Sequence, residues 1–117
     1  ILKIFKNKNN LNNSYNIIKE NKYVKPSWFG IPILISKNLE RDKIVSNLEK
    51  KGVETRPIIS GNFLNQKAAK IHNLNSKKNK FPNADYVEKA GFFIGLHTTP
   101  IQKKILKLLT NTLLNDL

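Results

Sequence analysis

The sequence predicts a small α+β domain, with a mixed or antiparallel sheet of a few strands and helices packed on one side. Short β-rich runs alternate with segments whose apolar residues repeat at helical spacing. Gly and Pro residues separate these segments and mark their turns. With 117 residues, 39% of them hydrophobic, the chain is long enough for one domain with a modest core.

The first 14 residues are expected to lead into this domain. Residues 1–5 have the apolar pattern of a helix end, and residues 6–14 are a Lys/Asn connection without an apolar face. The sequence contains no Met and starts at Ile1. We therefore predict that the chain is a piece of a longer protein, with its domain over residues 15–117. Removal of a leader is the alternative explanation.

Two extended segments are expected in the first third of the domain. Residues 15–18 form a short one, and residues 28–35 form the strongest strand of the sequence after a charged loop over residues 19–25. Pro32 lies inside this strand and has no amide hydrogen to donate to a neighbour. We therefore expect the strand to lie at an edge of the sheet or to carry a bulge at Pro32.

A helix should follow, from Leu39 or Glu40 to Lys51. Asn38 is the candidate N-cap, and Gly52 stands just beyond the C-terminus. The residues expected to face the sheet are Ile44, Val45 and Leu48. A second strand from Val53 completes a β-α-β unit, in which the adjacency of the two strands stays open.

The second half of the chain predicts three more elements. Residues 67–71 form a helical turn, residues 83–90 a helix capped by Asn83 and stopped by Gly91, and residues 92–96 a third strand. Thr99 and Pro100 are expected to open the last helix. Its packing face is predicted to consist of Ile101, Ile105, Leu108, Leu109 and Thr112.

The stretch from Val53 to Gln66 has the composition of a ligand loop held at a strand end. Arg56 carries a planar fork of donors that can bind a carboxylate or a phosphate through two parallel hydrogen bonds. Gly61 permits a sharp turn, and the amides of Asn62 and Gln66 can donate and accept. An Arg-Pro step followed by a Gly-Asn turn is also ordinary loop chemistry, and this alternative stays open.

Residues for a self-sufficient active site are scarce. His72 and His97 are the only histidines, and neither belongs to a metal-ligand pattern. The sequence has no Cys, which excludes disulfides and thiolate metal sites. His97 ends an apolar strand just before a strand-to-helix junction, where polar groups could face an anion. A satisfied strand-end histidine is the alternative for that position.

The formal net charge of +13 suggests a nucleic-acid-binding module as a second hypothesis. Only Arg41 and Arg56 are arginines, although Arg is the residue most used to recognise bases. The abundance of Lys, Asn and Ile is what an A/U-rich coding sequence would produce without selection for a partner. A ligand-free interaction domain is a third hypothesis. The sequence has no apolar run of bilayer-spanning length, so a cytoplasmic protein without a membrane partner is expected.

Three ordered motifs carry a resemblance to a known family. They are Pro26-Ser27-Trp28-Phe29-Gly30-Ile31-Pro32-Ile33, the Arg-Pro and Gly-Asn loop at residues 53–66, and Pro82-Asn83-Ala84-Asp85-Tyr86 with Gly91-Phe92-Phe93-Ile94-Gly95-Leu96-His97. Together they resemble the C-terminal small domain of the DegT/StrS sugar-nucleotide aminotransferases, which have the aspartate-aminotransferase fold. The 3-dehydratase branch, which acts on nucleotide-linked 4-keto-6-deoxyhexoses, is the most similar.

This resemblance implies a pyridoxal-phosphate (PLP) enzyme of deoxy-sugar, amino-sugar and lipopolysaccharide biosynthesis, whose PLP-binding large domain is absent from the chain. A nucleotide-linked sugar and glutamate are the implied partners, and a homodimer is the implied assembly. A Lys would make the intact protein an aminotransferase, and a His in its place would make it a 3-dehydratase; that residue lies outside this sequence. The isolated chain is expected to bind no PLP and to catalyse nothing.

The resemblance also implies roles for individual residues. The substrate-binding residues that it predicts are Arg56, Gly61, Asn62, Gln66 and His97. Arg56 is expected to bind an anionic group of the substrate or amino donor. Asn62 and Gln66 are expected to position polar groups near the cleft. No catalytic residue and no metal ligand is expected in this chain.

Overall fold

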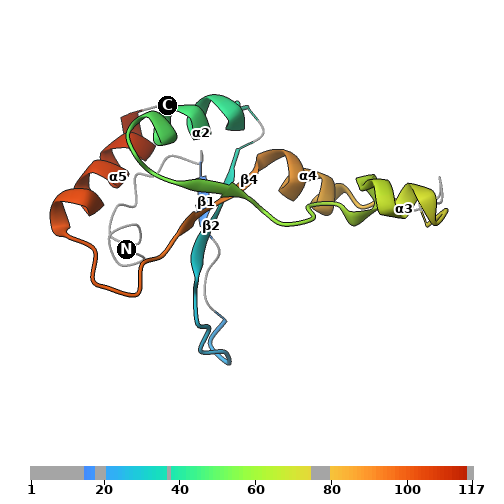
Figure 1. The fold of residues 1–117 in the computed structure, drawn as a ribbon, viewed down its shortest axis with the longest axis horizontal. Coiled ribbons are helices and arrows are strands. Elements are labelled where there is room, and N and C mark those ends of the chain that lie inside the picture. The colour runs from blue at the N-terminus through green and yellow to red at the C-terminus, as the bar shows by residue number, and fades with distance from the viewer. Residues whose placement is uncertain (1–14, 18–20, 37, 75–79, 116–117) are drawn as a thin grey trace.

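The computed structural model describes residues 15–17, 21–36, 38–74 and 80–115. The predicted helix end and linker at residues 1–14 lie outside this part of the chain. The described residues contain one antiparallel sheet, in which the strands lie in the order β1 (Tyr15–Ile17), β2 (Gly30–Ile35), β4 (Gly91–Gly95) and β3 (Thr55–Pro57) (Figure 1). The predicted α+β class is confirmed.

One face of the sheet forms the hydrophobic core. Ile31, Ile33 and Ile35 alternate along β2 and are at most 3% exposed. The helices α2 (Arg41–Lys50) and α5 (Lys103–Asn115) pack against these residues and against β4 (Figure 1). The cluster also contains Ile44, Leu48, Ala90, Phe92, Ile94, Leu109 and Leu113. The sequence prediction of helices on one side therefore holds for α2 and α5.

The prediction that Pro32 marks an edge strand or a bulge is wrong for the pairing with β4. The strand β2 lies between β1 and β4, and its register with β4 runs from Gly30↔Gly95 to Leu34↔Gly91 without an extra residue. The hydrogen bond from Leu96 N–H to the Phe29 carbonyl makes that pair a hydrogen-bonded one. Such pairs alternate along an antiparallel ladder, so the nitrogen of Pro32 points away from β4 and toward the side of β1. The described pairing with β1 covers only Ile33 to Ile35. Pro32 therefore removes no hydrogen bond from the ladder between β2 and β4.

The helix α2 begins and ends close to the predicted positions, but its N-cap differs. Glu40 is the N-cap and makes no side-chain capping hydrogen bond, so the prediction of Asn38 is wrong. Gly52 follows the helix with a φ of 79°, as expected for a residue that ends a helix in the left-handed region. The strand β3 then pairs with β4, so β4 separates β2 from β3.

The last two long helices start at other residues than predicted. The helix α4 (Pro82–Ala90) is preceded by Phe81 as N-cap, because Pro82 suits the first helical position. The helix α5 starts at Lys103, three residues after Pro100. Its core-facing residues include Leu109 and Leu113, whereas Ile105 and Leu108 are about half exposed. Of the predicted face, Leu109 and Thr112 are buried as expected, whereas Ile105 and Leu108 are not.

The short elements after β3 lie away from the core. The 3-10 helix η1 (Phe63–Asn65) and the helix α3 (Lys67–Ile71) contact one another. In Figure 1, α3 lies at the far end of the molecule from α2 and α5, with α4 between them. The helix α4 meets the sheet where β2 ends, since the Tyr86 hydroxyl donates to the Ile35 carbonyl. The segment after β3 is thus presented beside α4.

Candidate functional site

Arg56 lies on β3 opposite Phe93 of β4, and its side chain is 65% exposed. Its Nε and Nη2 atoms donate to the same oxygen of Glu54, Oε1, at 3.1 and 2.5 Å. The guanidinium is therefore held at the surface and is not buried in the core. An exposed ion pair of this kind is weak, so an anionic ligand can compete with Glu54 for the guanidinium.

The loop after β3 has an unusual backbone. Ser60 and Gly61 both have positive φ angles, 71° and 48°. A Cβ atom at Gly61 would lie 2.6 Å from the Cβ of Glu88 in α4, so the loop backbone approaches this helix more closely than a side chain would permit. The sequence prediction of a close turn at Gly61 matches this geometry, and the surface that the turn approaches is α4.

Replacing Gly61 by Ala should destabilise the protein by about 2 kcal/mol or more, because a left-handed backbone penalty adds to the clash with Glu88. Gly52→Ala is the matched control, since Gly52 has a φ of 79° but no atom within 4 Å of the added Cβ. Its cost should be limited to about 1 kcal/mol, the backbone term alone. Urea denaturation of both variants measures the difference in the free energy of unfolding. Equal decreases in this free energy would contradict the crowding at Gly61.

Asn62 is buried, with 7% of its surface exposed. Its side-chain Nδ2 donates to Oδ1 of Asp85 at 2.7 Å, and its Oδ1 accepts from the Leu64 backbone N–H at 3.1 Å. The same side chain therefore caps η1 and joins the loop to α4. Because both ends of the amide are engaged inside the protein, Asn62 shapes the loop in this structure.

The neighbouring amides complete this arrangement. Asn65 Nδ2 donates to Oε2 of Glu88 at 2.6 Å and to Oδ1 of Asp85 at 3.3 Å. Gln66 is exposed, and its Nε2 donates to the Ser60 carbonyl at 3.2 Å. The Gln66 side chain thus closes the loop on itself.

His97 is exposed and lies two residues beyond β4. The loop at Gly61 lies near the opposite end of this strand, because Pro57 pairs with Phe92 and the loop packs on the helix that precedes Gly91. The Cα atoms of Gly91 and Gly95 are separated by about 13 Å of extended chain. The structure therefore brings Gly61, Asn62 and Gln66 together and places His97 apart from them.

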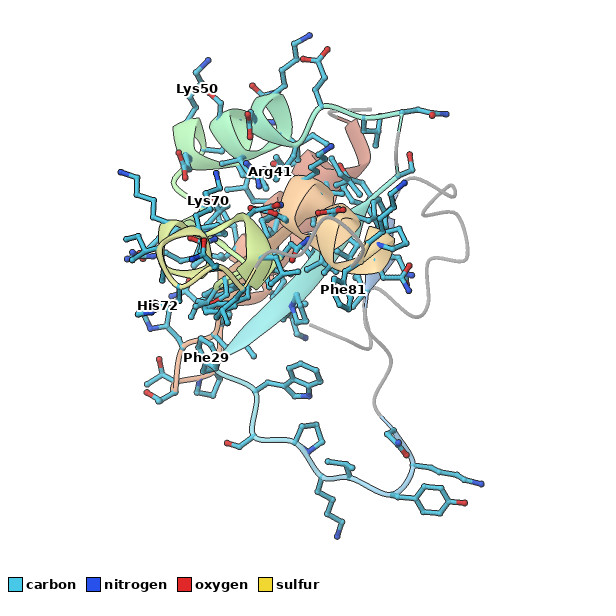
Figure 2. The ribbon with its side chains drawn as sticks, turned by 90° about the vertical axis from the view of Figure 1, so that its right-hand side faces the viewer. Phe29, Arg41, Lys50, Lys70, His72 and Phe81 are labelled. Carbon is cyan, nitrogen blue, oxygen red and sulfur yellow. The ribbon has the colours of Figure 1, made fainter. Side chains whose placement is uncertain are left out.

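Three residues that sequence reasoning did not select take part in the site. Asp85 and Glu88 bind the loop, and Arg41 Nη1 donates to the Glu88 carbonyl at 2.8 Å, which ties α4 to α2. Figure 2 shows Arg41 between these helices. Asp85 belongs to the Pro-Asn-Ala-Asp-Tyr motif, so a signal was present, but no sequence pattern indicated that its partner is Asn62.

An open hollow of about 530 Å³ lies beside this group. It is lined by Glu40, Arg41, Asp42, Asn65, Glu88 and Lys89. Arg41 pairs with Asp42 at 2.9 Å, so charges within the hollow compensate one another. None of the five predicted site residues lines it, and we assign it no ligand.

The described residues offer neither a metal site nor a membrane span. No group of three or more His, Cys, Asp or Glu side chains in this part of the chain could hold a metal ion. No helix within it has both the length and the apolar character needed to cross a bilayer.

Charge and hydrogen bonding decide whether these residues fit PLP. A phosphate needs donors that are free to turn toward it, but Asn62 and Asn65 donate to Asp85 and Glu88. Those carboxylates would repel a phosphate. The loop therefore does not fit the cofactor's phosphate, whereas the exposed guanidinium of Arg56 fits a single anionic group.

Comparison with known proteins identifies relatives of this chain. No family model matches it. A GDP-4-keto-6-deoxy-D-mannose 3-dehydratase of Escherichia coli is 38% identical over 73 residues, which are 61% of this chain and 19% of the relative. An enzyme of the same name from Yersinia pseudotuberculosis is 31% identical over 81 residues, 68% of this chain and 21% of the relative. The chain spans about one fifth of the length of these curated relatives.

Solved structures agree with these relatives. A GDP-4-keto-6-deoxymannose-3-dehydratase mutant with bound GDP-perosamine matches 96% of this chain at 29% identity and a TM-score of 0.78, over 29% of its own length. The Escherichia coli enzyme with bound hydrated PLP gives the same TM-score, 0.78. A third structure holds a trapped PLP-glutamate geminal diamine and matches at 31% identity and a TM-score of 0.74.

The antiparallel sheet, its two covering helices and the polar loop after β3 therefore constitute an α+β domain of a kind found in PLP enzymes. In particular, the chain is similar in sequence and fold to one part of the GDP-4-keto-6-deoxymannose 3-dehydratases. This confirms the resemblance drawn from the sequence motifs.

Proposed function

We propose that this chain is the C-terminal, substrate-covering domain of a PLP-dependent 3-dehydratase that acts on a nucleotide-linked 4-keto-6-deoxyhexose. The observation that carries the proposal is the match of 96% of the chain to a 3-dehydratase that binds a GDP-linked sugar. Both curated relatives bear the name of the same 3-dehydratase, which favours dehydration over amino transfer. The cytoplasm and a part in deoxy-sugar and lipopolysaccharide biosynthesis belong to the same proposal.

Within this function PLP, held by another part of the enzyme, supplies an electron sink for the loss of the C3 hydroxyl, and glutamate supplies the amino group. The described residues bind and orient the substrate. Arg56 binds an anionic group, because its guanidinium is exposed and, among the described residues, forms an ion pair with the exposed Glu54. Gln66 is an exposed residue whose amide contacts the substrate, and Gly61 and Asn62 give the loop its shape.

His97 contributes a second contact in this proposal. Because it lies beyond the opposite end of β4 from the loop, one compact group cannot touch both. A nucleotide-linked sugar is elongated and can reach both positions. In one orientation of the substrate, His97 contacts the sugar and the loop contacts the nucleotide. In the other orientation, these two contacts are exchanged.

The test is an assay of the intact enzyme that carries this chain, supplied with PLP, glutamate and GDP-4-keto-6-deoxymannose. We expect a sugar product that has lost its C3 hydroxyl and keeps its 4-keto group, with glutamate converted to its keto acid and its nitrogen released as ammonia. A product that keeps this hydroxyl and carries a new amino group would overturn the dehydratase proposal in favour of an aminotransferase. The isolated chain under the same conditions should form no product.

Replacing Glu54 by Gln should strengthen anion binding at Arg56, because the ligand no longer displaces a carboxylate. Exposed ion pairs contribute little, so the KM for the nucleotide sugar should fall by about two- to fivefold. Glu49→Gln is the control, since Glu49 accepts from the Thr55 hydroxyl at 2.8 Å and not from Arg56. Steady-state kinetics of the intact enzyme measure the change. An unchanged or higher KM in Glu54→Gln would contradict the competition.

The proposal includes a homodimer of the intact enzyme. Large apolar side chains are exposed on this chain, among them Phe29 at 71%, Ile59 at 76% and Ile71 at 74% (Figure 2 labels Phe29). Exposed apolar groups of this size favour coverage by further protein surface. Sedimentation of the intact enzyme tests this assembly, and a monomer at assay concentration would overturn it.

A further inference from the structure

The segment from Ile58 to Gln66 follows Arg56 and the strand β3, and we call it the Arg56 loop. Few interactions within this segment stabilise its conformation. Its backbone hydrogen bonds are local, from Asn65 N–H to the Asn62 carbonyl and from Gln66 N–H to the Phe63 carbonyl. Its 3-10 helix η1 has no buried residue. Left-handed angles at Ser60 and Gly61 persist only where surrounding contacts impose them.

The contacts that impose them come from α4. Oδ1 of Asp85 accepts from Asn62 at 2.7 Å and from Asn65 at 3.3 Å, so a single oxygen joins two points of the loop. Oε2 of Glu88 accepts a second bond from Asn65, and the side chain of Glu88 packs on Gly61. Asp85 is half-buried, and Asn62 is almost fully buried, so this link is shielded from water.

A carboxylate at position 85 also sets the orientation of the Asn62 amide. An ionised carboxylate only accepts hydrogen bonds, so Asn62 must turn its NH₂ group toward Asp85. Its oxygen is then directed at the Leu64 N–H and caps η1. One side chain on α4 thereby determines both the attachment of the loop and the start of its helix.

We propose that Asp85 is the positioning residue that holds the Arg56 loop in its substrate-binding shape. The effect of Asp85 on substrate binding rests on the proposed function, whereas its effect on the loop conformation rests on the hydrogen bonds alone. If Asp85 is lost, the loop samples other conformations, and the apparent affinity falls by the fraction of time spent in the competent one. Saturating substrate restores that conformation, so kcat should change little while KM rises.

The test uses four variants of the intact enzyme. Asp85→Ala removes the acceptor, and Asn62→Asp places two carboxylates against each other. The double variant Asn62→Asp/Asp85→Asn restores the hydrogen bond with donor and acceptor exchanged, while residue 62 still offers an oxygen to Leu64 N–H. Glu40→Gln is the control, because its carboxylate is 70% exposed and pairs with the exposed Lys43 outside the loop.

Two measurements are needed. Amide hydrogen exchange at residues 64–66 should accelerate by about tenfold or more in Asp85→Ala and in Asn62→Asp, and should return to within about threefold of the parent rate in the double variant. In the two single variants the KM for the nucleotide sugar should rise by about tenfold, with kcat changed by less than about threefold. PLP absorbance should be unaffected. Glu40→Gln should match the parent in every measurement.

The outcomes separate the two proposals. An unchanged rate of amide hydrogen exchange in Asp85→Ala would overturn the positioning role of Asp85. So would a double variant whose amides exchange as fast as those of the single variants. Faster exchange together with an unchanged KM would support that role and overturn the proposed contact between the loop and the substrate.

Discussion

Replacing Arg56 by Ala in the intact enzyme should raise the KM for one of its two substrates by about 10- to 100-fold. Hydrogen bonds to charged groups contribute about 1.5–3 kcal/mol, and an Arg fork can make two of them to one anion. The structure places this fork on β3 at the surface, 65% exposed, where its ion-pair partner among the described residues is the exposed Glu54. Separate titrations of the nucleotide sugar and of glutamate show which substrate carries the anion.

Two further variants make this experiment specific. Arg56→Lys keeps the charge but loses the fork, so its KM should lie between those of the parent and Arg56→Ala. Lys50→Ala removes one positive charge from an exposed position in the last turn of α2 (Figure 2) and should leave both KM values unchanged. Normal KM values for both substrates in Arg56→Ala would remove Arg56 from the binding site.

Replacing Phe92 by Ala should destabilise the domain by about 3–5 kcal/mol, as large-to-small changes at buried aromatic residues do. Phe92 is 1% exposed and lies in the middle of the sheet, where it pairs with Ile33 on one side and Pro57 on the other. The remaining cavity would face α2 and α5, whose packing depends on this face. Urea denaturation followed by circular dichroism measures the loss.

Phe29→Ala is the matched control for this prediction. Phe29 is 71% exposed and contacts Phe93 edge to face, with ring centroids 5.4 Å apart. Losing that contact should cost no more than about 1.5 kcal/mol. Equal losses in the two variants would contradict the assignment of the core to the face of the sheet that carries Phe92.

The elements that were predicted well are those with a strong local pattern. Residues 28–35 were predicted to form the strongest strand, and β2 covers Gly30–Ile35 of this stretch, with Ile31, Ile33 and Ile35 buried. Apolar residues at helical spacing indicated α2, and Gly52 marked its end. These signals work because side-chain direction repeats every two residues in a strand and every 3.6 in a helix. They therefore depend on neighbours in sequence alone.

The predictions that failed concern features in which local signals compete. Asn38 and Asn83 are good cap residues, yet the helices begin at Arg41 and Pro82. At α4 the fixed φ of proline favoured an earlier start. Thr99 and Pro100 had a favourable pattern, but α5 starts at Lys103, from where Leu109 and Leu113 reach the core. The position of a helix start is decided in part by what its buried face contacts.

For the site, the sequence by itself determined its ingredients: an arginine fork before a turn with Gly61 and Asn62, and motifs sufficient to identify the relatives. Only the tertiary structure decided their arrangement. It placed β4 between β2 and β3, separated His97 from the loop, and set Asp85 against Asn62 across 23 residues of sequence. The reason is physical: a residue type specifies which hydrogen bonds a side chain can make, whereas the partner is specified by the packing of α4 against the sheet, which involves the whole chain.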